Sequence, residues 1–457
     1  MKATIGLEIH TELKTVTKMF CRSKNDPDEK RPNVNICPIC LAHPGTLPVI
    51  NQEAVKHVLR VGLAVGGQLA DYTEFDRKNY FYPDIPKGYQ ISQYRYPLVT
   101  GGSLKGITLT RIHLEEDTAR SQHDAKSGSS LVDYNRAGVP LMELVTEPVV
   151  ESAAEAGAFA REWQLLLRTL GVSEANMEKG EMRVEANISL DMGTKVEVKN
   201  LNSFRSVEQA IGFELKRQKE VLEKREKVVQ ETRGWDEVKG VTFSQRLKES
   251  SHDYRYFPDP DLPKLRLGQI AEFANLQQTL PELPVAKRTR LTSLGLKPED
   301  VELLVSDLIL GLWFDEVVKN LSQEDSVLTA INYTTSDLQS ALKTGAKLPE
   351  PAHFAELISL IVGGEVSSRG AKDILAVMLT DGGAPRAIAQ AKNLFQSSDT
   401  DTLAKIIEQV IADNATVFSD FKSGNDKVLQ FLVGQGMKIS GGSANPQLLM
   451  DLFKARR

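Results

Sequence analysis

Polar side chains that could bind a metal ion or a phosphate recur at every second position in several short, otherwise apolar segments. The sets are Glu8 and His10; His113, Glu115 and Asp117; Arg183, Glu185, Asn187 and Ser189; and Lys195, Glu197 and Lys199. Successive side chains of a β-strand point to opposite faces, so each set lies on one face of its strand. The intervening Leu, Ile and Val residues face the other way. The pattern predicts a sheet with one apolar face and one face rich in carboxylates and bases.

This polar face favours a site for Mg²⁺ and phosphate. Mg²⁺ prefers hard oxygen ligands, and it usually reaches proteins through a few carboxylates together with substrate phosphates. The sequence has no Walker-type loop and no Gly-x-Gly-x-x-Gly motif, so any ATP must bind to this sheet, as in carboxylate-activating ligases. For a single strand, a solvated outer face is the simpler interpretation. The same pattern in four segments favours the site.

Three further segments combine charge with aromatic or turn residues. Residues 77–90 and 252–261 are aromatic, basic and rich in proline. Each could line a substrate cleft or form a rigid turn packed on the core. In residues 133–145, Arg136 could clamp a phosphate or carboxylate and Glu143 could be a further metal ligand. The alternative is that this Arg and this Glu pair with each other.

The three cysteines suggest a zinc knuckle. Cys37-Pro38-Ile39-Cys40 is a Cys-x-x-Cys motif, and Cys21 lies upstream. A structural zinc site needs four ligands, so Asp26, His43 or water would have to complete it. The alternative is an empty, vestigial site. If zinc binds, we expect partial occupancy and a structural role.

Several other catalytic classes find no support in the sequence. No His-x-x-x-His pair is present, and the Gly/Ser patches lack a neighbouring lysine or His–Asp pattern. A His-rich zinc hydrolase and a serine amidase are therefore unsupported. The cysteines belong to the knuckle, which argues against a cysteine glutaminase. We expect that the chain does not release ammonia from an amide donor itself.

The bulk composition is that of an ordinary soluble protein with several domains. The chain has 457 residues, 41% hydrophobic and 26% charged, and a net charge of −5. This charge argues against a general polyanion binder, but a local basic patch could still hold RNA. No apolar run approaches the roughly 20 residues of a membrane helix, and the N-terminus enters a strand at once. We expect a cytoplasmic protein with no membrane contact.

The order of the predicted elements indicates an α+β fold with an antiparallel sheet. We expect strands at residues 5–10, 107–117, 182–190 and 195–199, and helices at residues 151–170 and 206–227. Prolines near residues 279–284 mark a linker, and the remaining chain is helical, with helix stops at Gly363-Gly364 and Gly382-Gly383. The predicted domains are residues 1–283, 284–395 and 396–457.

Beyond these patterns, long motifs resemble a known family over essentially the whole chain. They are Ile5–His10, Arg77–Tyr94, His113–Asp117, Asp133–Arg136, Glu143–Val145, Lys199–Phe204, Asp253–Asp259, Phe431–Gln435 and Ala444–Leu448. These motifs are similar to those of the B subunits of bacterial and organellar aspartyl/glutamyl-tRNA amidotransferases and of an archaeal relative specific for Glu-tRNA.

The resemblance implies a glutamine-synthetase-like cradle domain that binds ATP, Mg²⁺ and the tRNA acceptor end, followed by a helical domain and a helical tail that contacts tRNA. ATP·Mg²⁺ would phosphorylate the side-chain carboxylate of Glu-tRNA(Gln) or Asp-tRNA(Asn). Ammonia channelled from a partner amidase, the A subunit, would then form the amide, and a small C subunit would complete a heterotrimer. The sequence does not distinguish the two tRNA substrates.

The candidate residues follow from the strand pattern and the resemblance together. The expected catalytic residues are Glu8, His10, Lys78, Glu115, Glu116, Arg136 and Glu143. The expected ATP-binding residues are Arg183, Glu185, Asn187 and Lys199. The resemblance implies Mg²⁺ ligands at His10, Glu116 and Glu143, whereas the period-two pattern favours Glu115 over Glu116. Both glutamates are therefore candidate Mg²⁺ ligands.

The sequence departs from the family pattern in two places. Zinc-bearing members have Cys-x-Cys where this chain has Cys21-Arg22-Ser23, and many have Arg-Cys-Asp where it has Arg183-Val184-Glu185. The first difference removes a zinc ligand, and the second lengthens a carboxylate by one methylene. Two other interpretations remain, a non-catalytic tRNA-binding scaffold and a stand-alone ligase for a small carboxylate.

Overall fold

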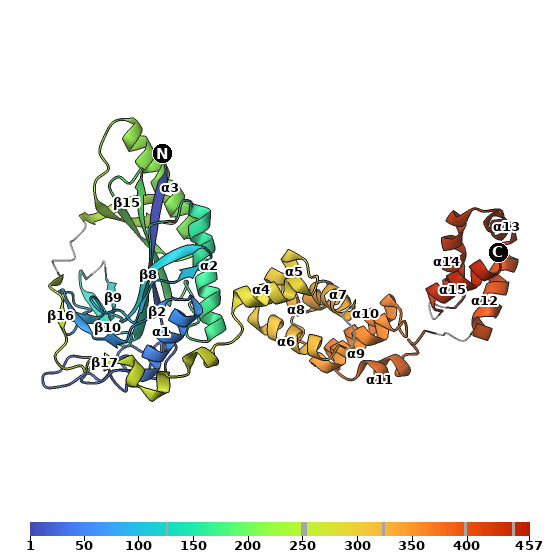
Figure 1. The fold of residues 1–457 in the computed structure, drawn as a ribbon, viewed down its shortest axis with the longest axis horizontal. Helices are drawn as coiled ribbons and strands as arrows, with labels where there is room; N and C mark the ends of the chain where they lie inside the picture. The colour runs from blue at the N-terminus through green and yellow to red at the C-terminus, as the bar shows by residue number, and fades with distance from the viewer. Residues whose placement is uncertain (125–126, 248–253, 322–324, 397–399, 441–443) are drawn as a thin grey trace. The chain divides into compact units, whose positions relative to one another are not determined.

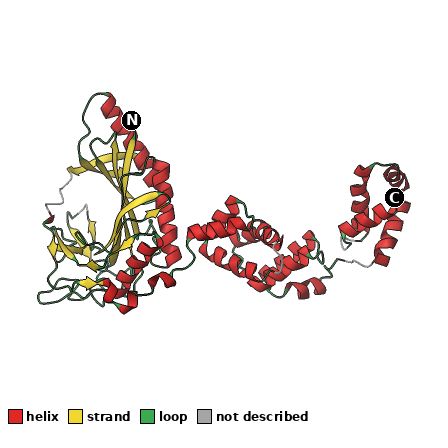
Figure 2. Cartoon of the chain, in the orientation of Figure 1, coloured by secondary structure: helices red, strands yellow, loops and turns green. Residues whose placement is uncertain are grey.

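The computed structural model describes residues 1–124, 127–247, 254–321, 325–396, 400–440 and 444–457 (Figure 1). The chain divides into two compact units, Met1–Pro284 and Val285–Arg457. The first contains the described strands, and the second is helical (Figure 2). An α+β architecture with a large N-terminal sheet and a helical C-terminal part is therefore confirmed. The boundary between the second and third predicted domains, at residue 395, stays a prediction.

The first unit is built on a 10-stranded sheet in the order β15-β14-β13-β12-β1-β11-β8-β6-β2, with β7 paired to β8. Its described pairings are antiparallel, apart from the parallel pair β13 and β14. The strands are β1 (Ala3–Glu12), β2 (Gln68–Leu69), β6 (Val99–Thr100), β7 (Ser103–Leu104), β8 (Ile107–Glu116), β11 (Pro140–Thr146), β12 (Met182–Leu190), β13 (Val196–Leu201), β14 (Glu231–Asp236) and β15 (Val241–Leu247).

Small sheets accompany the large one. Strands β9 (Arg120–His123) and β10 (Ser130–Asp133) pair with each other, as do β3 (Tyr72–Thr73) and β17 (Leu265–Arg266). A further sheet joins β4 (Asp76–Asn79), β5 (Tyr89–Ser92) and β16 (Phe257–Pro258). The pairing of β4 with β16 brings together the two aromatic segments singled out in the sequence. Residues 252 and 253 of the second segment lie outside the described residues.

One face of the large sheet packs against α1 (Gln52–Ala64), α2 (Ala153–Leu170) and α3 (Phe204–Glu223), as Figure 1 shows. Ile5, Leu7 and Ile9 of β1 are almost completely buried on this side. Ser152 caps α2 by accepting a hydrogen bond from the backbone of Glu155, and Gly171, with a φ of 68°, ends the helix. The opposite face of the sheet carries the polar side chains.

The predicted strands are all confirmed, and their ends lie within a few residues of the expected positions. The predicted helices are α2 and α3, which begin at Ala153 and Phe204. The prediction placed the end of the second helix at Lys227, but α3 ends at Glu223, and Arg225 already has a φ of 60°. A left-handed backbone at that position cannot continue a helix.

The second unit consists of helices and short turns. The helices are α4 (Pro284–Ser293), α5 (Pro298–Ser306), α6 (Leu308–Lys319), α7 (Asp325–Tyr333), α8 (Gln339–Lys343), α9 (Pro351–Val362), α10 (Ser368–Thr380), α11 (Pro385–Ala391), α12 (Thr400–Asp413), α13 (Ala415–Lys422), α14 (Leu429–Ile439) and α15 (Pro446–Ala455). Helices α12 to α15 enclose their own apolar core around Phe421, Leu432 and Phe453. Across the described ranges, no helix is both long and apolar enough to cross a bilayer.

Candidate active site

The register of the central strands places the predicted polar residues side by side. On β1, His10 lies opposite Glu143 of β11 and Arg183 of β12, and Glu8 lies opposite Glu185. Glu143 in turn lies opposite His113 of β8. Neighbouring strands are about 4.8 Å apart, so side chains that share a face at these positions meet directly.

The centre of this face is a cluster of carboxylates around His10. The His10 Nε2 atom is 3.3 Å from Glu143 Oε2, 3.7 Å from Glu115 Oε1 and 3.8 Å from Glu8 Oε1. His113 Nε2 lies 3.4 Å from the same Glu143 oxygen. Glu115 and Glu143 are buried, and their side chains project from neighbouring strands. The structure thus brings together Glu8, His10, Glu115 and Glu143.

The donor atoms of this cluster fit a hard divalent cation. Ligand atoms of Glu8, His10 and Glu143 lie within 4.8 Å of one another, and so do those of His113, Glu115 and Glu143. In octahedral Mg²⁺ coordination, ligands stand about 2.1 Å from the metal, so opposite ligands are separated by about 4 Å. A third group, formed by Glu8, Glu185 and Glu197, meets the same 4.8 Å limit. Shared glutamates therefore link these groups across the sheet.

The charges of the cluster are strongly coupled. Burial disfavours the imidazolium of His10, but the hydrogen bond and charge of Glu143, aided by Glu185 and Glu115, outweigh it and raise the pKa to about 9. Burial also acts on Glu143, yet the two flanking histidines hold its pKa well below the usual value. Burial and the neighbouring carboxylates raise the pKa of Glu8 to about 7. A bound cation would take the place of the proton on His10.

Basic and aromatic side chains surround the cluster. A cavity of about 370 Å³ is lined by Glu8, Lys78, Ser92, Gln93, Tyr94, Arg111, His113, Glu143, Lys195, Glu197, Lys199, Thr232, Tyr254 and Tyr256. The ammonium of Lys78 lies 5.1 Å from the ring centre of Tyr254. Burial opposes its charge, but Glu115, Tyr256 and Glu143 outweigh this and raise the pKa of Lys78. The cavity therefore offers cations to a polyanion beside the carboxylates.

The structure separates the two candidate glutamates of β8. Glu115 accepts a hydrogen bond of 3.0 Å from Ser92 Oγ and faces His10. Glu116 instead forms an ion pair of 2.5 Å with Lys87 and accepts a hydrogen bond from the backbone of Ile91. Successive strand residues point to opposite faces, so Glu116 lies apart from His10 and Glu143. The geometry groups Glu115, and not Glu116, with the proposed ligands.

Arg136 and Arg183 also lie outside the carboxylate cluster. The Arg183 guanidinium pairs with Asp117 at 2.9 Å, and Arg136 Nε lies 3.5 Å from the same carboxylate oxygen. Arg136 does not pair with Glu143, the alternative raised by the sequence, because the turn that carries it points to Asp117. It borders a separate cavity of about 380 Å³ beside Glu12.

The other predicted ATP-binding residues lie at the edge of the carboxylate cluster. Lys199 pairs with Glu185 at 2.8 Å and lies in the cavity, and Asn187 lies opposite Gly6, two residues from Glu185 along the same strand. Burial lowers the pKa of Lys199, but Glu185 and Glu197 outweigh this, so the net shift is upward. These residues are placed to extend the polar face beyond Glu8.

Sequence reasoning missed several residues of the cavity. Arg111 continues the period-two pattern of His113 and Glu115 by one step and could have been found that way. Tyr254 and Tyr256 belong to the second aromatic segment, for which a cleft and a core turn were equally open. Thr232 gave no signal, because only the parallel pairing of β14 with β13 places it beside Glu197.

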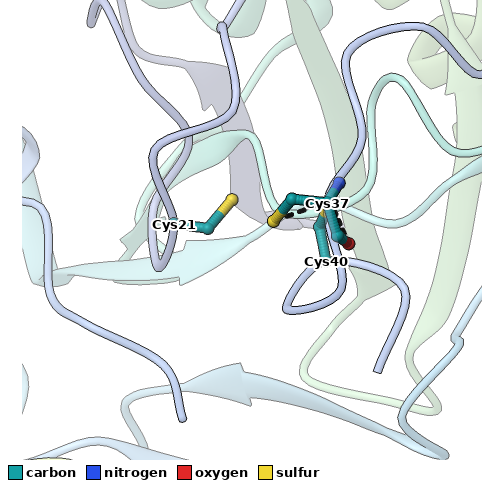
Figure 3. A group of neighbouring side chains, drawn as sticks. All are labelled: Cys21, Cys37 and Cys40. Atoms are coloured by element: carbon teal, nitrogen blue, oxygen red, sulfur yellow. Dashed lines mark hydrogen bonds between the residues drawn. The ribbon is translucent and has the colours of Figure 1, made fainter. Parts of the chain in front are cut away.

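The three cysteines lie together in the loops between β1 and α1. Their sulfur atoms lie within 4.8 Å of one another, and those of Cys37 and Cys40 are 3.8 Å apart (Figure 3). Within the described residues, no His, Asp or Glu has a ligand atom within 4.8 Å of all three sulfurs. The Ser23 hydroxyl is 3.9 Å from the sulfur of Cys40. Three thiols without a fourth ligand do not make a complete structural zinc site.

Comparisons with known proteins find similarity over nearly the whole chain. The model of the GatB/GatE catalytic domain matches residues 3–271, and that of the GatB domain matches residues 312–456. The B subunit of the aspartyl/glutamyl-tRNA(Asn/Gln) amidotransferase of Synechocystis sp. is 43% identical over 99% of this chain and 97% of its own length. The protein of the same name from Moorella thermoacetica is 44% identical over 100% of this chain and 99% of its own length.

A further relative is named as a chloroplastic/mitochondrial protein. The B subunit of the chloroplastic/mitochondrial glutamyl-tRNA(Gln) amidotransferase of Physcomitrium patens is 42% identical over 100% of this chain and 85% of its own length. The matched regions include both the sheet and the helical tail.

The raised pKa of His10 predicts a pH-dependent stability of the metal-free protein. Its folded value of about 9 exceeds the usual 6.5, so its contribution is complete below pH 6.5 and is lost as the pH rises through 9. That contribution is on the order of 3 kcal/mol at most. We expect the urea concentration at the unfolding midpoint, measured in the presence of chelator, to decrease as the pH is raised from 6.5 to 9. His10→Gln should flatten this dependence, and an unchanged slope in the variant would contradict the assignment.

The separation of Glu115 from Glu116 predicts different metal affinities for two conservative variants. Glu115→Gln removes an oxygen charge from the cluster, so Mn²⁺ binding, measured by the free-ion electron paramagnetic resonance signal, should weaken by about 10-fold or more. Glu116→Gln breaks only the pair with Lys87 and should change the affinity by no more than about 3-fold. The reverse order would favour Glu116 as the ligand.

The incomplete cysteine cluster predicts substoichiometric zinc. Elemental analysis of protein purified without chelator should find less than one zinc per chain, because the Ser23 hydroxyl is seldom ionised. Ser23→Cys supplies a fourth thiolate and should raise the zinc content to one per chain. Tightly held stoichiometric zinc in the unaltered protein would refute this expectation.

Proposed function

The chain belongs to the GatB/GatE family, and on that basis we propose that it activates the side-chain carboxylate of Glu-tRNA(Gln), Asp-tRNA(Asn) or both for amidation. It is then the B subunit of a tRNA amidotransferase, a carbon–nitrogen ligase that uses glutamine as nitrogen donor. The observation that carries the proposal is the grouping of Glu8, His10, Glu115 and Glu143 at a cavity rich in cations.

The proposed reaction has two steps. The side-chain carboxylate attacks the γ-phosphorus of ATP, which forms an acyl phosphate and releases ADP. Ammonia then attacks the acyl carbon, phosphate leaves and the amide remains. A carboxylate is a poor electrophile because its charge is delocalised, and phosphorylation supplies a leaving group. Two anions must approach each other in the first step, so the site has to neutralise charge.

The residues of the carboxylate cluster and of the neighbouring cavity are suited to that task. His10, Glu115 and Glu143 would hold Mg²⁺, which supplies positive charge to the phosphates when bound. Lys78, Arg111, Lys195 and Lys199 line the same cavity and would orient the phosphate oxygens. In this proposal the carboxylates bind the metal and the basic residues bind the phosphates. The same roles are expected of a glutamine-synthetase-like site.

His113 acts on the site through Glu143. It is buried with 3% of its surface exposed, and its Nε2 atom shares the Glu143 oxygen with His10. Two imidazoles on one oxygen fix the carboxylate in place and favour its charged form. His113 would therefore orient a metal ligand.

The nitrogen must come from a partner. No amidase centre is expected in this sequence, so ammonia would reach the cavity from a partner amidase, the A subunit, and a small C subunit would complete the heterotrimer. The names of the relatives, which describe one member of a multi-subunit tRNA amidotransferase, support this assembly. We propose that the helical second unit holds the body of the tRNA and that the complex works in the cytoplasm.

Glu143→Gln distinguishes a catalytic role from that of a tRNA-binding scaffold. With ATP, ammonium, mischarged tRNA and the partner proteins, the variant should form amide at least about 100-fold more slowly, because the cluster loses a ligand and its charge. Binding of tRNA, measured by gel shift, should stay within about 2-fold. Glu151→Gln, which changes an exposed carboxylate paired with Lys2, is the matched control and should retain activity. Unchanged amide formation by Glu143→Gln would favour the scaffold.

A further inference from the structure

The cysteine cluster has the geometry of a dithiol. The sulfur atoms of Cys37 and Cys40 are 3.8 Å apart, and that of Cys21 lies within 4.8 Å of both (Figure 3). A disulfide bond measures about 2.05 Å, so the two sulfurs would have to approach each other further to form one. Within the described residues, no His, Asp or Glu completes the group as a fourth ligand.

A buried lysine lies beside the sulfurs. Lys18 is fully buried, and its ammonium interacts with Cys40 and donates a hydrogen bond of 3.0 Å to the backbone of Tyr134. Burial lowers the pKa of Lys18, whereas the nearby thiols of Cys40 and Cys21 oppose this shift. Asp26, the one carboxylate among the candidate fourth ligands, is paired with Lys24 at 2.7 Å.

Local hydrogen bonds hold Cys37 and Cys40 face to face. The backbone amide of Cys37 donates to the sulfur of Cys40 at 3.1 Å, and the Leu41 amide donates to the Cys37 carbonyl at 3.1 Å. The chain therefore folds back into a tight turn over the Cys-x-x-Cys segment. Such a turn brings the two sulfurs to within 3.8 Å of each other.

A small oxidant can reach the pair. Cys37 is partly exposed and lines a cavity of about 810 Å³ together with Cys21. Cys40 is buried, but it borders a second cavity of about 270 Å³. Both cavities exceed the volume of a peroxide molecule, whose size is close to that of water.

We propose that Cys37 and Cys40 form a reversible disulfide when the chain meets a hydroperoxide. One thiolate attacks the peroxide oxygen, which breaks the O–O bond, gives a sulfenic acid and releases water or an alcohol. The second thiol then attacks the sulfenic sulfur and displaces water. Two electrons pass from the two thiols to the peroxide, and a dithiol reductant restores them. Cys21 remains a thiol.

The test uses the full-length protein freed of metal by a chelator. Treatment with hydrogen peroxide at a few equivalents should remove two of the three reactive thiols, and dithiothreitol should restore them. Cys21 is separated from the pair by Arg22 and other tryptic sites, whereas Cys37 and Cys40 lie on one tryptic peptide. That peptide should lose the mass of two hydrogen atoms without being joined to the Cys21 peptide.

Single substitutions provide the controls. Cys21→Ser should still form the disulfide, and both Cys37→Ser and Cys40→Ser should abolish it. Because Cys37 is partly exposed, Cys37→Ser keeps the test decisive if Cys40→Ser fails to fold. Three thiols remaining after peroxide, a link between the Cys21 peptide and the Cys37–Cys40 peptide, or direct conversion to sulfinic acid would each overturn the proposal.

Discussion

The mutual repulsion of carboxylates around His10 is the constraint on which the catalytic unit depends. Glu8 and Glu143 hold their ligand atoms within 4.8 Å of each other and of the His10 ring. Two like charges at about 4 Å repel by about 4 kcal/mol at an effective dielectric constant of roughly 20. The protonated imidazole of His10 and the nearby ammonium of Lys78 offset this repulsion in the metal-free protein. The sheet therefore holds several carboxylates close enough together to bind a cation.

The positions of these side chains depend on a fixed register of the central strands. Strand β1 is hydrogen-bonded on both sides, to β11 and β12, and its apolar face is covered by buried residues of α2 such as Phe159 and Trp163. A shift of one residue would turn His10 towards the helices and bring Ile9 onto the polar face. The core residues thus fix the register, and the register fixes the distances between the ligands.

The α+β class, the central strands and the grouping of Glu8 with His10 were predictable from sequence, because period-two alternation depends only on neighbouring residues. Glu115 and Glu116 stayed open, since the alternation and the family resemblance disagreed, and the structure places Glu115 beside His10. Arg136 could not be placed from sequence because a turn sets its direction. Thr232 could not be found because its strand joins the sheet through a parallel pairing between distant segments.

The presence of serine rather than cysteine at position 23 leaves the surrounding loop in place because other bonds hold it. The backbone of Lys18 donates to the Ser23 carbonyl at 2.9 Å, and that of Met19 donates to the Gly138 carbonyl at 2.7 Å. Asn135 accepts hydrogen bonds from the amides of Val34 and Asn35. These contacts tie the loop to the turn before β11. These hydrogen bonds therefore run through the backbone of the loop and Asn135, and not through the three thiols.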